Sequence, residues 1–458
     1  MLGELAKLIG AEHLLAAPAS SLYNSDASRR RGLRGRADAV ALPGSAREVA
    51  EVVRWCYAHD VAIVPRGGGT GLTGGAVPTD GGVVLSLERL RAVRELEPGL
   101  WRMFVEAGVS THDVQRLARE NGLFFGPDPG ASEQSQIGGN VATNAGGPHA
   151  LKYGVTGAWV TGLEAVLAPG ELVGVGGWSR KDVAGYDIKD LLIGSEGTLG
   201  VITAVRLRLL PAREAQIAQA VFVRTRAQGC AAMLDVRAAG MEVAAMDFAD
   251  GEALAHVAGG YPGEVPGGAG FALLIEVDGT REQARAQADE LCELLGGVAL
   301  AIERPDDTSA LWRWRDGFNG LLSGVRGAKV SEDVSFPVER LQEGLERFEQ
   351  IAARHRLVSC AFGHGGDGNV HATVLVDPAD EAELDRAQAV GTEVFALVGE
   401  LGGSIAAEHG VGWLKRGLLA SQWDARAVQL HEQIKLAFDP KGLLNPGKKL
   451  ARPPAPGS

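Results

Sequence analysis

The segment VPRGGGTGLTGG, which runs from Val64 to Gly75, decides the fold. Residues 69–74 match the GxGxxG pattern that follows the first strand of a Rossmann dinucleotide-binding unit. That pattern should open a helix, but here Pro78 and the turn at 79–82 lead directly into another strand-like run. Consecutive glycines let backbone N–H groups converge on an anion without obstruction by Cβ atoms. We therefore interpret the segment as a phosphate-binding loop outside the Rossmann class.

Glycine is unusually abundant in the whole chain. It accounts for 64 of the 458 residues, about twice the average usage of ~7%. Hydrophobic residues make up 45% and charged residues 22%, which supports a sizeable core and excludes disordered and fibrous classes. Two further glycine clusters, at 126–147 and 193–202, combine glycine with short hydrogen-bonding side chains. Much of the excess is therefore local to a few loops.

The pattern of the chain changes near Pro211. Between residues 38 and 212, short apolar runs alternate with turn residues, and a predicted helix at 45–60 begins with Ser45 and Glu48 as a capping box. After that point each strand pattern is followed by an amphipathic helix, which predicts an antiparallel sheet covered by helices. We predict an α+β protein with five parts: a helical segment (1–37), a first domain (38–212), a second domain (213–400), a C-terminal segment (401–450) and a disordered tail (451–458).

Charge and cysteine content narrow the context. The 45 Lys and Arg against 57 Asp and Glu give a net charge of −12 without a basic stripe, so no nucleic-acid partner is expected. Four isolated cysteines favour buried thiols over a disulfide framework or a thiolate metal site. The N-terminal stretch does not read as a signal peptide, and no run reaches the ~18 apolar residues of a membrane span. We expect a cytoplasmic protein, and leave peripheral membrane association and a homodimer open.

Several motifs together resemble one family. They are PRGGGTGLTGG (65–75), DPGASEQSQIGGNVATNAGG (128–147), KYGVTGAWVTGLEAVLAPGE (152–171), GYDIKDLLIGSEGTLGVIT (185–203), GHGGDGNVH (363–371), AAEHGVG (406–412) and LLNPGK (443–448). The chain resembles the FAD-binding oxidoreductase/transferase type 4 family of the vanillyl-alcohol-oxidase type. Within it, the resemblance is to the group of glycolate oxidase FAD-linked subunits, D-lactate dehydrogenases and D-2-hydroxyglutarate dehydrogenases, and it covers nearly the whole chain.

The resemblance implies a PCMH-type FAD-binding domain of two subdomains at 38–212 and an α+β substrate or cap domain with an antiparallel sheet at 213–400. The segment 401–450 would return to the FAD site. Relatives that tether FAD carry a histidine where this chain has Thr70, so we expect non-covalent FAD. The matching positions imply FAD contacts by Arg66, Gly67, Gly68, Gly69, Thr70, Gly71, Thr73, Gly74, Pro129, Ser132, Gly138, Gly139, Asn140, Thr143, Asn144, Glu196, Gly197, Gly200, Ile202 and Asn445.

A fourth glycine cluster separates two histidines. The runs SCAFGH (359–364) and NVHATVL (369–375) read as strands, and the intervening Asp367-Gly368 is a strong signal for a two-residue turn. In that register His364 pairs with His371, which would put their Cβ atoms ~4.5–5.5 Å apart on one face of the sheet. The two imidazoles could then share a metal ion.

A third ligand is suggested by Glu408, which precedes His409 on a predicted short strand, 404–408. Neighbouring strand residues point to opposite faces, so one would bind a metal while the other faces elsewhere. Two histidines and one carboxylate leave open positions on Zn²⁺ or another divalent ion. The alternative is a stacked surface histidine pair beside a solvated carboxylate. The resemblance implies metal ligation by His364, His371 and Glu408, with His409 as the catalytic base.

The resemblance also implies the reaction. FAD would oxidise a small D-2-hydroxy acid, D-lactate or glycolate, to the 2-oxo acid by metal-assisted proton abstraction and hydride transfer to the flavin. Arg315 matches the arginine of the family's LWxxR motif, and we predict that it clamps the substrate carboxylate; a helix-surface ion pair is the alternative. Relatives that take dicarboxylates carry a lysine where this chain has Ser331, which disfavours 2-hydroxyglutarate.

Other functions share parts of this pattern. They are a D-2-hydroxyglutarate dehydrogenase, a flavin-binding electron-transfer subunit, a non-redox FAD enzyme such as an alkyl-dihydroxyacetone-phosphate synthase, and a flavin-free metallohydrolase. The metallohydrolase leaves three glycine loops unused, and an electron-transfer subunit should lack the histidine and Glu-His elements. No iron–sulfur or haem ligand pattern is evident, so electrons would leave to oxygen, a quinone, a flavoprotein or partner subunits.

Overall fold

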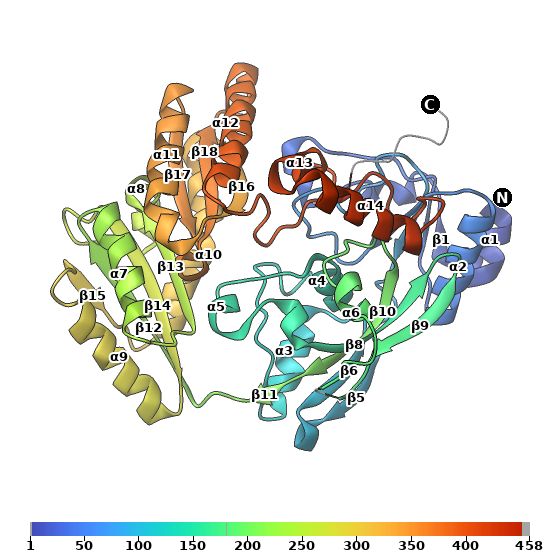
Figure 1. Ribbon diagram of the computed structural model, residues 1–458, viewed down its shortest axis with the longest axis horizontal. Helices are drawn as coiled ribbons and strands as arrows, with labels where there is room; N and C mark the ends of the chain where they lie inside the picture. The colour runs from blue at the N-terminus through green and yellow to red at the C-terminus, as the bar shows by residue number, and fades with distance from the viewer. Residues whose placement is uncertain (1, 180, 451–458) are drawn as a thin grey trace. The chain divides into compact units, whose positions relative to one another are not determined.

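The computed structural model describes residues 2–179 and 181–450 (Figure 1). The chain divides into two compact units. Unit 1 comprises 1–146, 154–212 and 408–458, and unit 2 comprises 147–153 and 213–407. The predicted tail at 451–458 lies outside the described residues.

Unit 1 is built around two larger sheets, with a short strand pair beside them. In the four-stranded sheet the order is β1-β2-β4-β3, with β4 parallel to both β2 and β3. In the five-stranded sheet the order is β5-β6-β10-β8-β9, and every neighbouring pair is antiparallel. The strands are β1 (Leu14–Leu15), β2 (Ala39–Ala41), β3 (Ile63–Arg66), β4 (Val83–Ser86), β5 (Val93–Glu97), β6 (Arg102–Glu106), β7 (Leu123–Phe124), β8 (Val160–Leu167), β9 (Glu171–Gly176), β10 (Val201–Arg208) and β11 (Leu210–Pro211).

Helix α2 (Ala46–Ala58) shows how the unit 1 core forms. Ser45 caps it by accepting the N–H of Glu48, as predicted, but the Glu48 carboxylate accepts the N–H of Gly44 at 2.7 Å, so the expected capping box is displaced by one residue. The apolar face of α2 enters a buried cluster that also contains Leu85 and Leu444. The other helices of unit 1 are α1 (Leu2–Ile9), α3 (Thr111–Glu120), α4 (Ile137–Thr143), α6 (Ile188–Leu192), α13 (Leu419–Gln422) and α14 (Ala425–Phe438).

Unit 2 contains one seven-stranded sheet in the order β15-β12-β14-β13-β17-β18-β16. Every neighbouring pair is antiparallel, which confirms the antiparallel sheet predicted for the second half of the chain. The strands are β12 (Ala215–Val223), β13 (Ala245–Asp250), β14 (Phe271–Gly279), β15 (Ala301–Glu303), β16 (Ala328–Ser335), β17 (Val358–Gly363) and β18 (Asn369–Val376).

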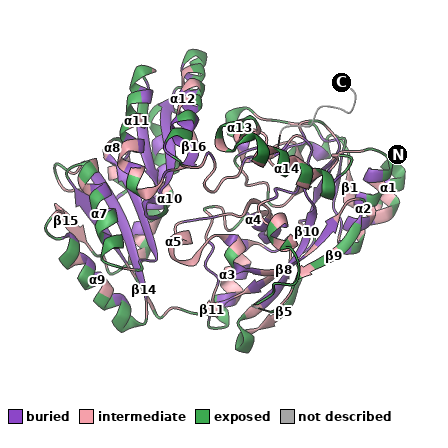
Figure 2. Cartoon of the chain, viewed as in Figure 1, coloured by how far each residue is buried: buried purple, intermediate pink, exposed green. Residues whose placement is uncertain are grey.

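Helices cover this sheet, and Figure 2 shows the strands buried beneath them. One buried cluster joins Leu254 and Val257 of one helix and Trp314 and Phe318 of another to β12, β14, β17 and β18, and it includes Phe362. The helices are α5 (Ala150–Tyr153), α7 (Arg226–Ala238), α8 (Gly251–Val257), α9 (Arg281–Leu295), α10 (Thr308–Arg326), α11 (Leu341–Arg354) and α12 (Glu381–Glu400). Across 2–179 and 181–450, no helix is both long and apolar enough to cross a membrane.

Candidate active site

The first glycine loop leaves β3 and reaches β4 without forming a helix, as predicted. A Cβ atom on Gly68 would overlap the carbonyl oxygen of Gln134, and one on Gly138 would overlap the Cβ of Ala107. Gly69 and Gly74 have φ values of +69° and +82°, which side chains rarely tolerate. Glycine is required here because backbone packs on backbone.

The second loop meets the first at the start of α4. A Cβ on Gly67 would lie 3.5 Å from the Cα of Gly139, so the two loops touch along their main chains. The Thr143 hydroxyl donates to the carbonyl of Gly139 at 3.1 Å. Asn144 ends the helix with a φ of +52°, and its Oδ1 accepts the N–H of Gly157 at 2.8 Å. These polar side chains therefore shape the backbone of the loop.

The third loop is joined to the C-terminal segment. The Glu196 carboxylate accepts the N–H groups of Val411 and Gly412 at 2.9 and 2.7 Å. Asn445 donates from Nδ2 to the carbonyls of Gly75 and Glu196 at 2.8 and 2.7 Å. The C-terminal segment thus closes onto the first and third loops, and the structure gives Glu196 a backbone-holding role.

The remaining predicted cofactor residues lie around these loops. Arg66 donates to the carbonyl of Ser25 at 2.8 Å; burial lowers the pKa of its guanidinium, and Asp26 opposes that shift. Thr73 donates to the carbonyl of His409 at 3.3 Å. Asn140 donates to the hydroxyl of Thr111. Thr70 and Gly71 lie in the first loop, and Pro129 and Ser132 precede α4. Gly197 and Gly200 lie between Glu196 and β10, and Ile202 is the second residue of β10.

Three buried polar atoms test whether these loops fit a dinucleotide. Gln136 Oε1, Ser195 Oγ and Asn445 Oδ1 have no hydrogen-bond partner among the described residues. Each belongs to, or adjoins, a different one of the converging segments. Buried polar atoms are normally satisfied, so a ligand that supplies partners there is expected. Together with the glycine backbone that no side chain covers, these three residues fit FAD.

The histidine hairpin of unit 2 differs from the prediction. His371 pairs with Phe362 rather than with His364, so the register is shifted by two residues. Strand β17 ends at Gly363, and a 3₁₀ turn at Gly365–Asp367 replaces the expected two-residue turn. Gly368 ends that turn with a φ of +79°, and a Cβ there would overlap the carbonyl of Phe336. The predicted pairing was wrong because Asp367-Gly368 forms the end of a longer loop.

The two imidazoles still lie close together despite the changed register. Their ring centroids are 5.7 Å apart and nearly perpendicular. His364 Nδ1 lies 2.8 Å from Oδ1 of Asp247, and Arg315 Nε donates to Oδ2 of the same carboxylate. Burial raises the pKa of Asp247, but His364 and Arg315 outweigh it and hold that pKa below its usual range.

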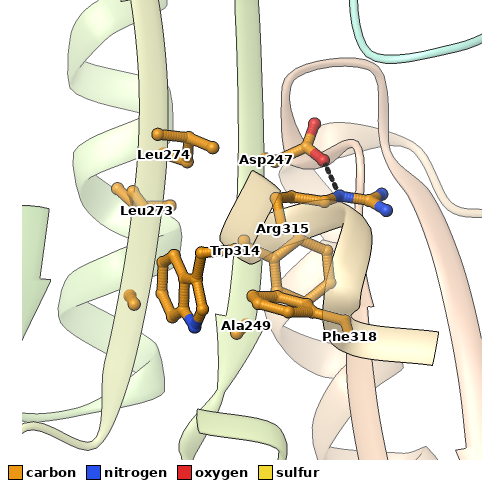
Figure 3. A pocket seen from close by; sticks show the side chains of 9 residues that line it. Asp247, Ala249, Leu273, Leu274, Trp314, Arg315 and Phe318 are labelled. Atoms are coloured by element: carbon orange, nitrogen blue, oxygen red, sulfur yellow. Dashed lines mark hydrogen bonds and ion pairs between the residues drawn. The ribbon is translucent and has the colours of Figure 1, made fainter. Parts of the chain in front are cut away.

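Arg315 is buried, which excludes the helix-surface alternative. It extends from α10 to a small pocket that Asp247, Trp314 and Phe318 also line (Figure 3). Its Nη2 has no hydrogen-bond partner among the described residues. A buried guanidinium nitrogen in this position is a donor suited to an anion.

Asp333, on β16, binds one residue of the neighbouring strand β18 and one residue of the segment that follows Ser404. Its Oδ1 accepts Nδ2 of Asn369 at 2.8 Å, and its Oδ2 accepts the N–H of Ala407 at 3.1 Å. Of the predicted strand 404–408, only Ser404 forms a bridge, to Ser335. The expectation of a strand was wrong: beyond that bridge the chain follows bends, with Asp333 holding the backbone of Ala407.

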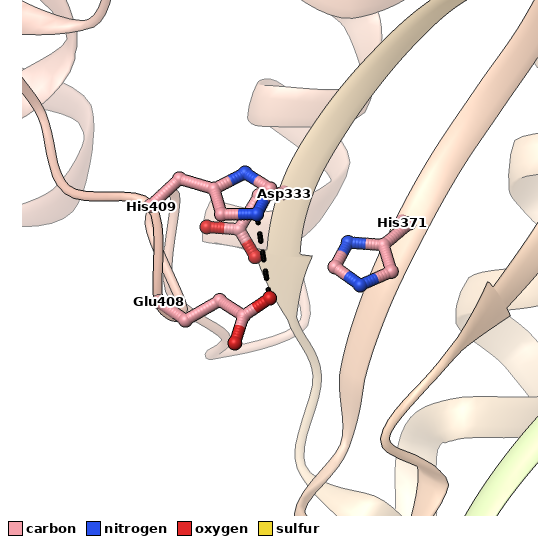
Figure 4. A group of neighbouring side chains, drawn as sticks. All are labelled: Asp333, His371, Glu408 and His409. Carbon is pink, nitrogen blue, oxygen red and sulfur yellow. Dashed lines mark ion pairs between the residues drawn. The ribbon is translucent and has the colours of Figure 1, made fainter. Parts of the chain in front are cut away.

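Because 404–408 is not a strand, Glu408 and His409 do not alternate between faces. His409 Nε2 lies 3.3 Å from Oε1 of Glu408. Both residues directly follow Ala407, whose N–H is bound by Asp333. Asp333, His371, Glu408 and His409 each offer a ligand atom within 4.8 Å of the others. Figure 4 shows these four side chains. His364 is outside this group, and His409, expected to face elsewhere, is inside it.

Comparison with known proteins gives the chain its family. Residues 37–176 match the FAD binding domain, and residues 212–449 match the C-terminal domain of FAD linked oxidases. The chain belongs to the FAD-linked oxidases. This confirms the resemblance found in the sequence, identifies an oxidoreductase, and shows that FAD is its cofactor.

Among these FAD-linked oxidases, two relatives show the range of named activities. The chain is 35% identical to the glycolate oxidase subunit GlcD of Bacillus subtilis, over 91% of this chain and 89% of that protein. It is 36% identical to the D-2-hydroxyglutarate dehydrogenase of Xanthomonas citri pv. viticola, over 91% and 90%. The p-cresol methylhydroxylase structure shares the fold with a TM-score of 0.80 at 18% identity, covering 98% of this chain and 96% of that one.

Sequence reasoning missed Asp247 and Asn369 and used Asp333 only as a reference position. Asn369 lies inside the quoted motif GHGGDGNVH, so the motif itself carried the signal. Asp247 offered a weaker one: a lone acid within the otherwise apolar run AAMDFA is costly to bury unless it is paired. Its two partners lie 68 and 117 residues away in sequence, so only the fold identifies them.

Proposed function

We propose that this protein oxidises a small D-2-hydroxy acid, D-lactate or glycolate, to the corresponding 2-oxo acid. The observation that carries the proposal is the convergence of Asp333, His371, Glu408 and His409, with ligand atoms within 4.8 Å of one another. Two relatives that align with 91% of this chain are named as a glycolate oxidase subunit and a D-2-hydroxyglutarate dehydrogenase, which supports the reaction class.

FAD would be held without a covalent bond by the three glycine loops and Asn445. Main-chain N–H groups at Gly67–Gly69 and Gly74 would face its pyrophosphate. When bound, FAD supplies the acceptor for the hydride that leaves the substrate. Gln136 and Ser195 bring buried oxygens that need partners, and Thr70 offers no histidine for a covalent link.

A divalent metal, with zinc the first choice, would be held by His371 and Glu408 of this group together with His364, which lies outside the group with its ring centroid 5.7 Å from that of His371. When bound, such an ion supplies Lewis-acid polarisation of the substrate hydroxyl. Asp333 lies in the same group of ligand atoms and also holds the backbone of Ala407, directly before Glu408. Nitrogen and oxygen donors of this kind suit zinc and related ions.

His409 would take the hydroxyl proton as general base. Its Nε2 lies 3.3 Å from Glu408, a carboxylate that would stabilise the imidazolium formed, and its carbonyl is held by Thr73. Arg315 would bind the substrate carboxylate through the end of the guanidinium that Asp247 does not occupy. The substrate thereby loses the hydroxyl proton and the α-hydrogen with its electron pair, and becomes the 2-oxo acid.

D-2-hydroxyglutarate is the second candidate, because the 36% identical relative bears that name. Ser331 lies on β16 two residues before Asp333, so both side chains share a face of the strand. The Ser331 hydroxyl lies 2.8 Å from that of Thr373, whereas Lys329 Nζ donates to Asn319 at 2.7 Å. Serine at position 331 therefore supplies no cation at that position for a distal carboxylate.

Anaerobic bleaching of the flavin tests the proposal. D-lactate or glycolate should reduce the flavin absorbance of purified protein within seconds, D-2-hydroxyglutarate should do so more slowly, and L-lactate serves as the stereochemical control. A flavin that stays oxidised with all four acids would contradict the proposal and favour a non-redox FAD enzyme. The same assay can then rank oxygen, a quinone and a flavoprotein as electron acceptors, and we propose a cytoplasmic location for the reaction.

A further inference from the structure

The Asp247 carboxylate contacts both Arg315 and His364. It lies on β13 and is 1% exposed. Its Oδ1 lies 2.8 Å from Nδ1 of His364, and its Oδ2 accepts from Nε of Arg315, so each oxygen serves a different partner. Figure 3 shows Arg315 extending past this carboxylate with its terminal nitrogens beyond it.

The backbone fixes this arrangement. Strand β13 pairs with β17 through Phe248 and Gly363, the residues next to Asp247 and His364. Arg315 comes from α10, where Trp314 and Phe318 pack into the buried cluster over the same sheet. The three polar groups therefore meet because a strand pair and a packed helix bring them together, with His364 directly after the end of β17.

The two contacts of Asp247 determine which atoms of His364 and Arg315 are left to bind other groups. A carboxylate bound to Nδ1 makes that nitrogen the donor, which leaves Nε2 as the atom that would bind an ion. A carboxylate bound to Nε of Arg315 leaves the Nη end of the guanidinium, where Nη2 is buried without a partner among the described residues. One side chain would thus set both the metal-facing nitrogen and the anion-facing donors.

We propose that Asp247 is a positioning residue that orients His364 toward the metal and Arg315 toward the substrate carboxylate. This inference rests on the proposed function, since it takes the roles of His364 and Arg315 from there. Asp247 would touch neither substrate nor metal itself. It would act by fixing a ring tautomer and a guanidinium direction, so its loss should weaken two binding events together.

Asp250 provides a matched control on the same strand. It is 3% exposed and its oxygens accept only backbone N–H groups, from Ala253 at 2.9 Å and from Ala361 at 3.0 Å. Asp250→Asn removes a buried carboxylate of the same size without touching the arginine or either histidine. Any effect that arises merely from losing a buried aspartate of β13 should therefore appear in both variants.

The experiment compares Asp247→Asn and Asp250→Asn in the FAD-loaded full chain. Zinc content after dialysis is measured by mass spectrometry, and oxalate affinity by the change in flavin absorbance. We expect Asp247→Asn to bind zinc and oxalate each about 10–100-fold more weakly, with FAD content unchanged. Asp250→Asn should keep both affinities within about twofold of wild type, because it holds backbone alone.

A double variant separates the two arms of the proposal. In an Arg315→Met background measured with zinc at saturation, Asp247→Asn should lower oxalate affinity little further, because the arginine through which it acts on the anion is already gone. It should still lower zinc affinity in that background, since His364 is intact. Additive losses of oxalate affinity would overturn the Arg315 arm, and unchanged zinc affinity would overturn the His364 arm.

The outcomes also separate this inference from the proposed function. Equal losses in the Asp247 and Asp250 variants, or none in either, would overturn the role of Asp247. Weaker zinc binding in Asp247→Asn alone would support that role even if no 2-hydroxy acid reduced the flavin, a result that would contradict the proposed reaction. Wild-type protein that bound neither zinc nor oxalate would overturn both.

Discussion

The cofactor loops of unit 1 are shaped by glycine backbone, whereas the polar cluster of unit 2 (Asp247, Arg315 and His364) is formed by side chains. In unit 1, Gly68 and Gly138 are required because a side chain would overlap neighbouring main chain or side chain. In unit 2, Asp247, Arg315 and His364 act through their side chains and come from a strand, a helix and a loop. The first site requires glycines that have no Cβ atom, and the second requires side chains that the tertiary structure brings together. The two sites should therefore respond differently to the same perturbations.

Metal removal should separate the two sites most sharply. Dialysis against a chelator should lower 2-hydroxy-acid turnover to background, because the histidine and carboxylate groups would lose the ion that they hold. Bound FAD should stay, since the glycine loops offer it main-chain groups. Turnover, zinc content and flavin absorbance measured on one sample check this, with zinc re-addition as the control. Full turnover in metal-free protein would remove the metal from the mechanism.

His409→Ala tests the chemical step alone. We expect kcat to fall by about 10²–10⁴-fold, the usual contribution of a positioned general base, with FAD content unchanged. His431→Ala is the matched control, because that imidazole on α14 contacts the carbonyl of Ala427 at 2.8 Å. Stopped-flow flavin reduction gives the rate for both variants. A His409 variant that reduced its flavin at the wild-type rate would exclude it as the base.

The comparison also explains what the sequence could predict. The loops of unit 1 were recognisable because glycine, threonine and asparagine follow one another in contiguous runs such as 65–75. A contact such as that of Asn445 with Gly75 and Glu196 spans 370 and 249 residues, and only the family resemblance pointed to it. Local composition can therefore identify a backbone-built site, while its closure by distant segments stays hidden.

The positions of the histidine and carboxylate residues were harder to predict, because they depend on strand register. A two-residue turn at 367–368 predicted that His364 faces His371, but the loop is longer and Phe362 takes that position. The alternation expected for Glu408 and His409 failed because 404–408 bends away after a single bridge. The sequence offers the residue types, but their partners depend on backbone pairing that short-range signals do not fix.

Gly68→Ala should damage the backbone-built site directly. Its Cβ would overlap the carbonyl of Gln134, so the first two loops must separate. We expect a loss of about 1–3 kcal/mol in the free energy of unfolding, as for other overpacked positions, together with release of FAD. Gly99→Ala is the control, because a Cβ there meets nothing within 4 Å. Thermal melts and flavin content measure both, and retention of full FAD by Gly68→Ala would contradict the tight approach of the loops.

Lys448 is a buried lysine of unit 1, and its substitution should have the smallest effect. It is 3% exposed, and its Nζ contacts the carbonyl of Pro446 at 3.5 Å and faces the ring of Trp413. Burial lowers the pKa of its ammonium to about 8 from 10.5, against the opposing charges of Asp80 and Asp26. Between these two pH values the folded protein releases the proton while the unfolded chain keeps it. The unfolded state then binds more protons, so the free energy of unfolding gains a contribution that grows as pH rises through this window.

Lys448→Met removes this titration and isolates it from every other group. We expect the free energy of unfolding of wild type to rise relative to the variant between pH 8 and pH 10, because the methionine carries no ammonium to desolvate. Urea unfolding of FAD-free protein at several pH values gives the difference, and Lys441→Met, whose half-exposed side chain pairs with Asp60, is the control. Parallel curves for wild type and the Lys448 variant would mean that this ammonium is solvated in the folded protein.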